Sequence, residues 1–169
     1  MRKTERFPVK GANSLWHVYD TVPFWKVIKN FIFIQAARYS PFLSWKNFFY
    51  RTFLRMEVGK ETSFALMVMV DVMFPERIKV GNNTIIGYNT TILAHEYLIN
   101  EYRIGDVIIG DRVLIGANST ILPGVTIGND AIISAATLVN ADVPEGCFVG
   151  GNPMRIIYTK EEMLERNAK

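Results

Sequence analysis

The sequence predicts a stacked solenoid with a six-residue unit, preceded by a helical region and followed by a short helix. A branched aliphatic residue recurs at every sixth position, at Ile109, Ile115, Ile121, Ile127, Ile133 and Val139. Four positions after each stands a small or β-branched residue: Val113, Ser119, Val125, Ala131, Thr137 and Val143. A period of six matches neither the helical period of about 3.6 nor the strand period of about 2. Such a fixed period indicates a repeat architecture.

Charge and aromatic content divide the chain into two regions. Residues 1–57 hold ten Lys and Arg against three Asp and Glu, whereas residues 58–169 hold nine against thirteen. The first region also holds 14 of the 21 aromatic residues. A chain of 169 residues is long enough for one domain with an appendage. We therefore expect two regions with different tasks.

Residues 1–57 are predicted to form helices that are interrupted near Pro23 and Pro41, because proline does not continue a helix. Apolar residues recur at helical spacing from Phe24 to Ala37, which predicts an amphipathic helix. Aromatic and cationic residues alternate through residues 24–55, and two roles stay open for them. They cover the solenoid as a helical cap, or they contact an anionic membrane surface. No recognised nucleic-acid motif accompanies them, so we expect no nucleic-acid partner.

The repeat region extends over residues 58–158, with two interruptions. Earlier units begin at Val58, Phe64, Val70, Val80, Ile86 and Ile92. The phase slips at Pro75–Arg77 and breaks again between Ile92 and Ile109, which predicts an insertion around Tyr97–Arg103. The ends of a stacked solenoid need caps. Residues 159–169 open with Thr159 and carry Glu162 three positions later, a capping box that predicts a C-terminal helix.

Composition also bears on location. Cys147 is the only cysteine, so no internal disulfide is expected and a reducing compartment is favoured. Residues 1–10 are polar and charged, unlike a signal peptide. The apolar run Phe31–Ile34 is too short to span a bilayer. We expect a cytoplasmic protein, with contact to the membrane surface through residues 24–55 as the open alternative.

The repeat region resembles the hexapeptide-repeat acyltransferases, in their acetyltransferase branch of maltose, galactoside and xenobiotic acetyltransferases. The most specific stretches run from Ile121 through Pro123-Gly124 to Gly128, and from Val149 through Asn152-Pro153 to Ile157. The resemblance implies a mainly β fold, a left-handed parallel β-helix with three units to each coil. It also implies acetyl-CoA as co-substrate, no metal, a small or saccharide acceptor, and a homotrimer with its sites between subunits.

His95 is the candidate catalytic residue. It ends the unit that begins at Ile92, immediately before the insertion, and loops carried on a rigid scaffold often hold function. Imidazole titrates near neutral pH and so suits proton abstraction from an acceptor. The resemblance implies that the acceptor, deprotonated by this histidine, attacks acetyl-CoA directly. The alternative is a structural histidine at a coil corner.

A catalytic histidine commonly has a partner that orients its second ring nitrogen. Glu96, Glu101 and Asp106 are close enough to His95 in sequence to be this partner. The alternative for each is a solvated carboxylate in a loop. In the sugar acetyltransferases an upstream asparagine contacts the acceptor. The corresponding position in this sequence is Ala65, so the chain departs from that pattern. Asp71 is the nearest upstream polar residue, and we take it as the candidate acceptor contact.

The resemblance assigns coenzyme A to the coil corners and the C-terminal end of the solenoid. By position, Ala117, Ala135 and Asn140 contact the pantetheine arm and Arg155 contacts a phosphate. Small corner residues allow close approach to the backbone, and a guanidinium matches phosphate geometry. Turn packing is the alternative role of the two alanines. The family often has a lysine at the position of Ala141, which removes one phosphate contact.

Three functions are compatible with a solenoid of this kind. The first is a coenzyme A-dependent O- or N-acetyltransferase. The second is a non-catalytic assembly module, which the presence of His95 and Arg155 disfavours. The third is a γ-type carbonic anhydrase, whose zinc needs three histidines, whereas the repeat region contains one.

Overall fold

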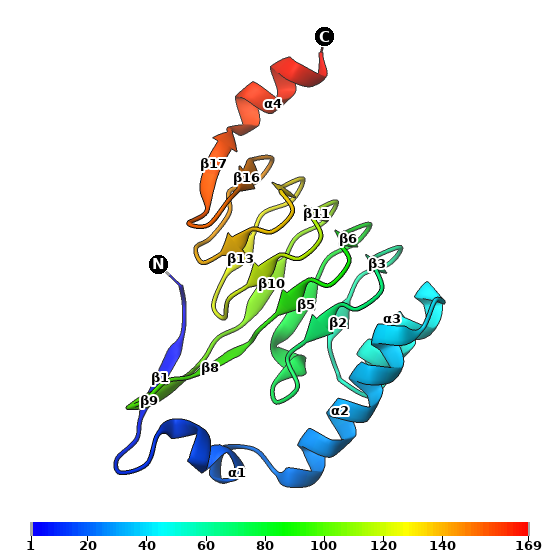
Figure 1. Ribbon diagram of the computed structural model, residues 1–169. Helices are drawn as coiled ribbons and strands as arrows, with labels where there is room; N and C mark the ends of the chain where they lie inside the picture. Colours follow the sequence, from blue (N-terminus) through cyan, green and yellow to red (C-terminus); the bar gives the residue numbers. More distant parts are fainter. Residues whose placement is uncertain (1, 169) are drawn as a thin grey trace.

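The computed structural model describes residues 2–168 and consists of a three-sided β-solenoid with helices at both ends (Figure 1). One sheet contains β2 (Glu57–Val58), β5 (Ile78–Val80), β10 (Val107–Ile109) and β13 (Thr126–Ile127). The second contains β3 (Ser63–Phe64), β6 (Ile85–Ile86), β11 (Leu114–Ile115), β14 (Ile132–Ile133), β16 (Phe148–Gly150) and β17 (Arg155–Tyr158). The third contains β4 (Met69–Val70), β7 (Thr91–Ile92), β12 (Thr120–Ile121) and β15 (Leu138–Val139). Consecutive strands enter successive sheets, so each coil contributes one strand to each side.

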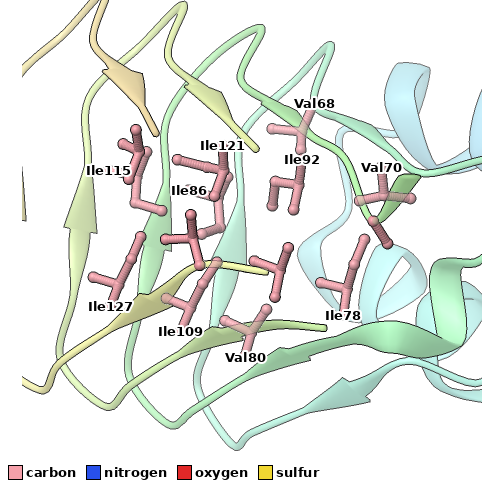
Figure 2. Close-up of a cluster of buried hydrophobic side chains, with 14 of the residues drawn as sticks. Val68, Val70, Ile78, Val80, Ile86, Ile92, Ile109, Ile115, Ile121 and Ile127 are labelled. Atoms are coloured by element: carbon pink, nitrogen blue, oxygen red, sulfur yellow. The ribbon is translucent and has the colours of Figure 1, made fainter. Parts of the chain in front are cut away.

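Parallel pairing stacks the predicted aliphatic residues in columns inside the solenoid. Ile115 lies in register with Ile86 on one side and Ile133 on the other. All three side chains are buried, and Figure 2 shows the columns side by side in the core. The six-residue period is confirmed as the period of the core, because every sixth residue points inward.

The coil corners depend on the residue before each small position. Asn118 and Ala136 have φ values of 59° and 56°, in the left-handed region that side chains rarely adopt. The next residues, Ser119 and Thr137, are buried in the corner. The Ser119 hydroxyl donates a hydrogen bond to the carbonyl of Gly116 at 2.8 Å. A small side chain at this position therefore fills the corner and satisfies its backbone.

The predicted insertion is a β-hairpin formed by β8 (His95–Tyr97) and β9 (Glu101–Ile104). A hydrogen bond of 2.9 Å from the amide of Gly105 to the carbonyl of Ala94 closes its base. The earlier phase slip is the 3-10 helix η2 (Pro75–Arg77). Both interruptions leave the solenoid between the same two sheets, and its register resumes after them.

The prediction that residues 1–57 are helical was wrong at residues 5–8, which form strand β1 (Glu5–Pro8). β1 pairs antiparallel with β9, so the hairpin becomes a three-stranded sheet. The reason is that β9 has a free edge whose backbone groups need partners. The segment then continues through the 3-10 helix η1 (Ser14–His17) and α1 (Val18–Thr21).

Helices α2 (Phe24–Tyr39) and α3 (Leu43–Thr52) begin just after Pro23 and Pro41, as predicted. α3 covers the first coil. The Lys46 ammonium donates to the carbonyls of Phe64 and Ala65 at 3.0 and 2.8 Å. The Tyr50 ring packs on Phe64, with centroids 4.6 Å apart. These contacts give the backbone carbonyls of the first coil a hydrogen-bond donor and cover its apolar side chains, as the cap interpretation requires.

At the opposite end, β17 pairs antiparallel with β16 and leads into α4 (Lys160–Asn167). The predicted capping box is confirmed: Glu162 accepts from the Thr159 amide at 2.7 Å, and the Thr159 hydroxyl accepts from the Glu162 amide at 3.4 Å. In the described part of the chain, no helix is both long and apolar enough to span a bilayer.

Candidate functional site

Strand pairing brings the turn after β4 beside the turn after β7. Val70 of β4 lies in register with Ile92 of β7. Asp71 follows the first strand, and His95 stands three residues after the second. One coil of the solenoid therefore supplies the carboxylate and the next supplies the imidazole.

Asp71 is held by five hydrogen bonds. Its Oδ2 accepts from Nδ1 of His95 at 2.6 Å, and from the backbone amides of Ala94 and His95 at 2.7 and 3.1 Å. Its Oδ1 accepts from the backbone amides of Met73 and Phe74 at 2.9 and 2.8 Å. The Asp71 side chain has no exposed surface. The carboxylate is thus fixed in position before any ligand binds.

These contacts also set the charge of Asp71. Burial alone raises the pKa of a carboxyl group, because it penalises the ionised form. Here the hydrogen bond and charge of His95, with the amides of Phe74 and Ala94, outweigh burial and hold the pKa of Asp71 below its usual value. The group is therefore a carboxylate at neutral pH and can only accept hydrogen bonds.

Because Asp71 is ionised, Nδ1 of His95 carries a proton and donates a hydrogen bond to the carboxylate. The second ring nitrogen, Nε2, has no hydrogen-bond partner among residues 2–168. The His95 side chain keeps 15% of its surface exposed, between the rings of Phe74 and Tyr97 at centroid distances of 6.0 and 5.2 Å. A neutral imidazole in this tautomer presents Nε2 as an oriented proton acceptor.

The N-terminal segment holds the hairpin that carries His95. The Tyr97 and Thr21 hydroxyls form a hydrogen bond of 2.7 Å. The Ser14 hydroxyl donates to the carbonyl of Leu98, at the hairpin turn, at 2.5 Å. Burial raises the pKa of Tyr97, so its hydroxyl remains protonated at neutral pH. Residues that are remote in sequence thus fix the hairpin on the solenoid.

The three carboxylates considered as partners of His95 lie in other ion pairs. Glu96 pairs with Arg2 at 2.9 Å, Glu101 with Arg6 at 2.7 Å, and Asp106 with Arg77 at 3.2 Å. The orienting partner is instead Asp71, which we predicted to contact the acceptor. Its complete burial leaves it no surface for such a contact.

The sequence contains a signal for this pair that the prediction did not use. Register pairs Val58 with Val80, so the first coil spans 22 positions, four more than three regular six-residue units, and the extra length includes the 3-10 turn at Pro75–Arg77. The position one such coil after Asp71 is Leu93, which stands two residues before His95. Counting coils rather than regular units therefore finds the pair.

The residues predicted to bind coenzyme A lie on two edges of the solenoid. Ala117 and Ala135 stack at the corner between the second and third sheets, where the Ala136 amide donates to the Ala117 carbonyl at 2.8 Å. Arg155 is paired with Gly150 at the end of the second sheet, and it is exposed. Asn140 follows β15, at the corner on the other side of the third sheet, which is also the His95 corner. One copy of the chain therefore does not bring all four residues to one place.

Sequence comparison identifies the family. A model described as the hexapeptide repeat of succinyl-transferase matches residues 106–141. YvoF of Bacillus subtilis (strain 168), a candidate acetyltransferase, is 76% identical over 169 residues, covering 100% of this chain and 98% of YvoF. SAR0816 of Staphylococcus aureus (strain MRSA252), also a candidate acetyltransferase, is 46% identical over 92% of this chain and 97% of its own length. The chain belongs to the hexapeptide-repeat acetyltransferase family. The resemblance noted in the sequence is confirmed.

Solved structures of this family share the fold. The hexapeptide-repeat acetyltransferase VCA0836 of Vibrio cholerae, in complex with acetyl coenzyme A, superposes with a TM-score of 0.67 at 22% identity, covering 80% of this chain and 87% of its own. A galactoside acetyltransferase in complex with coenzyme A gives 0.64 at 20% identity, covering 85% and 84%. Within residues 2–168, no three His, Cys, Asp or Glu side chains gather as a metal site requires.

Proposed function

We propose that this protein transfers the acetyl group of acetyl-CoA to a hydroxyl or amine of a small or saccharide acceptor, with His95 as general base. The observation that carries the proposal is the buried Asp71 carboxylate at 2.6 Å from Nδ1 of His95. It fixes the tautomer and leaves Nε2 to take a proton. Family members crystallised with acetyl coenzyme A or coenzyme A support the choice of co-substrate.

The proposed step needs no acyl-enzyme. The acceptor oxygen or nitrogen attacks the thioester carbonyl as its proton passes to Nε2 of His95, which gives a tetrahedral intermediate. The C–S bond then breaks, and the proton returns from Nε2 to the departing thiolate, so coenzyme A leaves as the free thiol. Asp71 stabilises the imidazolium that exists between the two transfers.

The two edges of the solenoid support a site shared between copies. His95 and Asn140 lie on one edge of the third sheet, and Ala117 and Ala135 lie on the other. We propose a homotrimer in which the His95 edge of one copy faces the Ala117 edge of the next, with Arg155 on a coenzyme A phosphate. In this proposal the coils wind left-handed over residues 58–158, between the N-terminal region 1–57 and the C-terminal helix 159–169.

The test is release of free thiol from acetyl-CoA in the presence of a panel of alcohol, sugar and amine acceptors. His95→Ala removes the base, and we expect the rate to fall by about a hundredfold to ten-thousandfold. Product analysis of the acceptor that reacts separates O- from N-acetylation.

His17→Ala is the matched control, since His17 is the only other histidine and lies on η1, hydrogen-bonded to Asp20. We expect its rate to equal that of the natural protein. Equal rates for His95→Ala and the natural protein, with both folded by circular dichroism, would exclude His95 as the base.

A further inference from the structure

The outward face of α2 is apolar and largely exposed, although the Phe24 ring contacts Tyr19 of α1 with centroids 5.4 Å apart. Residues inside this helix turn through about 100° per position. Asn30, Ile34 and Ala37 form its inward side, and the Asn30 amide donates to the carbonyl of Val72 at 2.8 Å. Exposed apolar side chains lie about half a turn away, at Trp25, Ile28, Ile32 and Tyr39, and about a quarter to a third of a turn away, at Phe24 and Phe31. A surface helix normally presents polar residues on that side.

α3 extends the same surface. Its inward side holds Lys46, Asn47 and Tyr50, which contact the first coil. Trp45 and Phe48 point the other way and keep 59% and 54% of their surface exposed. α2 and α3 pack side by side over the same end of the solenoid, opposite α4 (Figure 1). Their outward residues therefore form one surface, which we call the aromatic end face.

The charge of this region has one sign. Residues 24–55 contain six Lys and Arg and no Asp or Glu. Lys26 forms an ion pair with Glu76 at 2.6 Å, and Lys46 is buried in the cap. Lys29 is exposed on α2 at the margin of the aromatic end face, next to Trp25 and Ile32 on the helix surface. Both Trp25 and Lys29 thus point to solvent.

We infer that the aromatic end face docks the protein on an anionic lipid bilayer. Tryptophan and tyrosine favour the interface between headgroups and acyl chains, and lysine and arginine are attracted to anionic headgroups. A surface that combines both, on two helices that carry no acidic residue of their own, matches that environment. A symmetric contact between two such faces would instead bring like charges together. In the docked orientation the solenoid stays in water, because the apolar side chains of the aromatic end face belong to α2 and α3, which lie along one end of it.

The experiment is co-sedimentation of the full chain with vesicles of phosphatidylcholine alone or mixed with phosphatidylglycerol. We expect binding to the anionic vesicles, and weaker binding when the ionic strength is raised from about 0.1 M to about 1 M. Replacing Trp25 and Trp45 together by serine removes two interfacial anchors, and we expect affinity to fall on the order of a hundredfold. Lys29→Ala removes one surface charge and should weaken binding to anionic vesicles about fivefold.

Leu164→Ser is the control, because Leu164 is exposed to 62% on α4, at the other end of the solenoid. Its vesicle binding should equal that of the natural protein, and circular dichroism should show all variants folded. Absence of binding to anionic vesicles overturns the inference, as does equal binding by the double tryptophan variant. If that variant instead has a lower mass in sedimentation equilibrium and vesicles are not bound, the face is a contact between copies of the chain.

Discussion

The regular coils and the inserted hairpin differ in where each obtains its order. In the coils, Ile115 packs between Ile86 and Ile133, and every neighbouring position repeats the arrangement. The hairpin instead depends on a few contacts from elsewhere, chiefly Asp71 below it and the N-terminal segment beside it. A repeated scaffold spreads its stability over many similar contacts, whereas the candidate site rests on a few particular ones.

This difference predicts a division of effects. Substitutions inside the coils should lower stability and leave the activity of folded molecules unchanged. Substitutions at the hairpin should lower the activity of folded molecules and leave the stability of the fold unchanged. Asp71 is the exception, because it follows a coil strand and yet holds His95.

The largest effect in this comparison is expected from Asp71→Asn. The amide cannot stabilise an imidazolium at His95 as a carboxylate does, so kcat should fall by about a hundredfold or more. Because Asp71 is buried, the KM for acetyl-CoA should stay unchanged. Steady-state kinetics separate the two constants, and a rise in KM with normal kcat would contradict the positioning role.

Next in size is Ile115→Ala in the middle of the core. Ile115 is fully buried, and truncating such a side chain costs about 2–5 kcal/mol of the free energy of unfolding. Urea denaturation measures the loss, and the rate per folded molecule should be normal. Leu114→Ala is the neighbouring control, because Leu114 points outward and is 41% exposed, and its loss should be much smaller. Equal losses at both positions would contradict the assigned register.

A smaller effect is expected from Lys46→Met, which keeps the apolar length of the side chain. It leaves the carbonyls of Phe64 and Ala65 without their donor, and the unfolding free energy should fall by about 1–3 kcal/mol. Lys29→Met provides the comparison, since that lysine is exposed on the same pair of helices. Similar stability of the two variants in urea would remove the capping role of Lys46.

The smallest effect concerns pH. The pKa of Asp71 is lower in the folded state than its usual value, so the unfolded chain binds the proton first as pH falls. The stabilisation is therefore complete above the unfolded pKa of about 3.9 and is lost as pH drops through the lower folded value. Unfolding free energies measured from pH 5 downward should fall more steeply for the natural protein than for Asp71→Asn. Parallel curves would show that Asp71 has the same pKa in both states.

Much of the scaffold follows from local patterns in the sequence. The period of six places the inward residues, because every coil repeats the same steric requirement. Pro23 and Pro41 separate the helices, and Thr159 with Glu162 starts the last one. The position of His95 at the break in the repeat also follows from the sequence.

The candidate site could be predicted only in part. Its key contact joins Asp71 to His95 across 24 positions, and the slip at Pro75–Arg77 displaces the register between them. Strand β1 was missed because Glu5–Pro8 has no strand pattern of its own and is ordered by the edge of β9. A lysine such as Lys46 is normally expected at the surface. Its burial depends on the two backbone carbonyls to which it donates hydrogen bonds.

The six-residue repeat, its interruptions, the helix boundaries and the place of His95 all follow from local sequence, because each of these depends on residues close together in the chain. Three features depend on the folded chain instead: Asp71 orients His95, the N-terminal segment completes the hairpin sheet, and α3 caps the first coil. Those contacts join distant parts of the chain, and their partners are selected by unpaired backbone groups and by buried charge. Such requirements exist only after the coils have stacked.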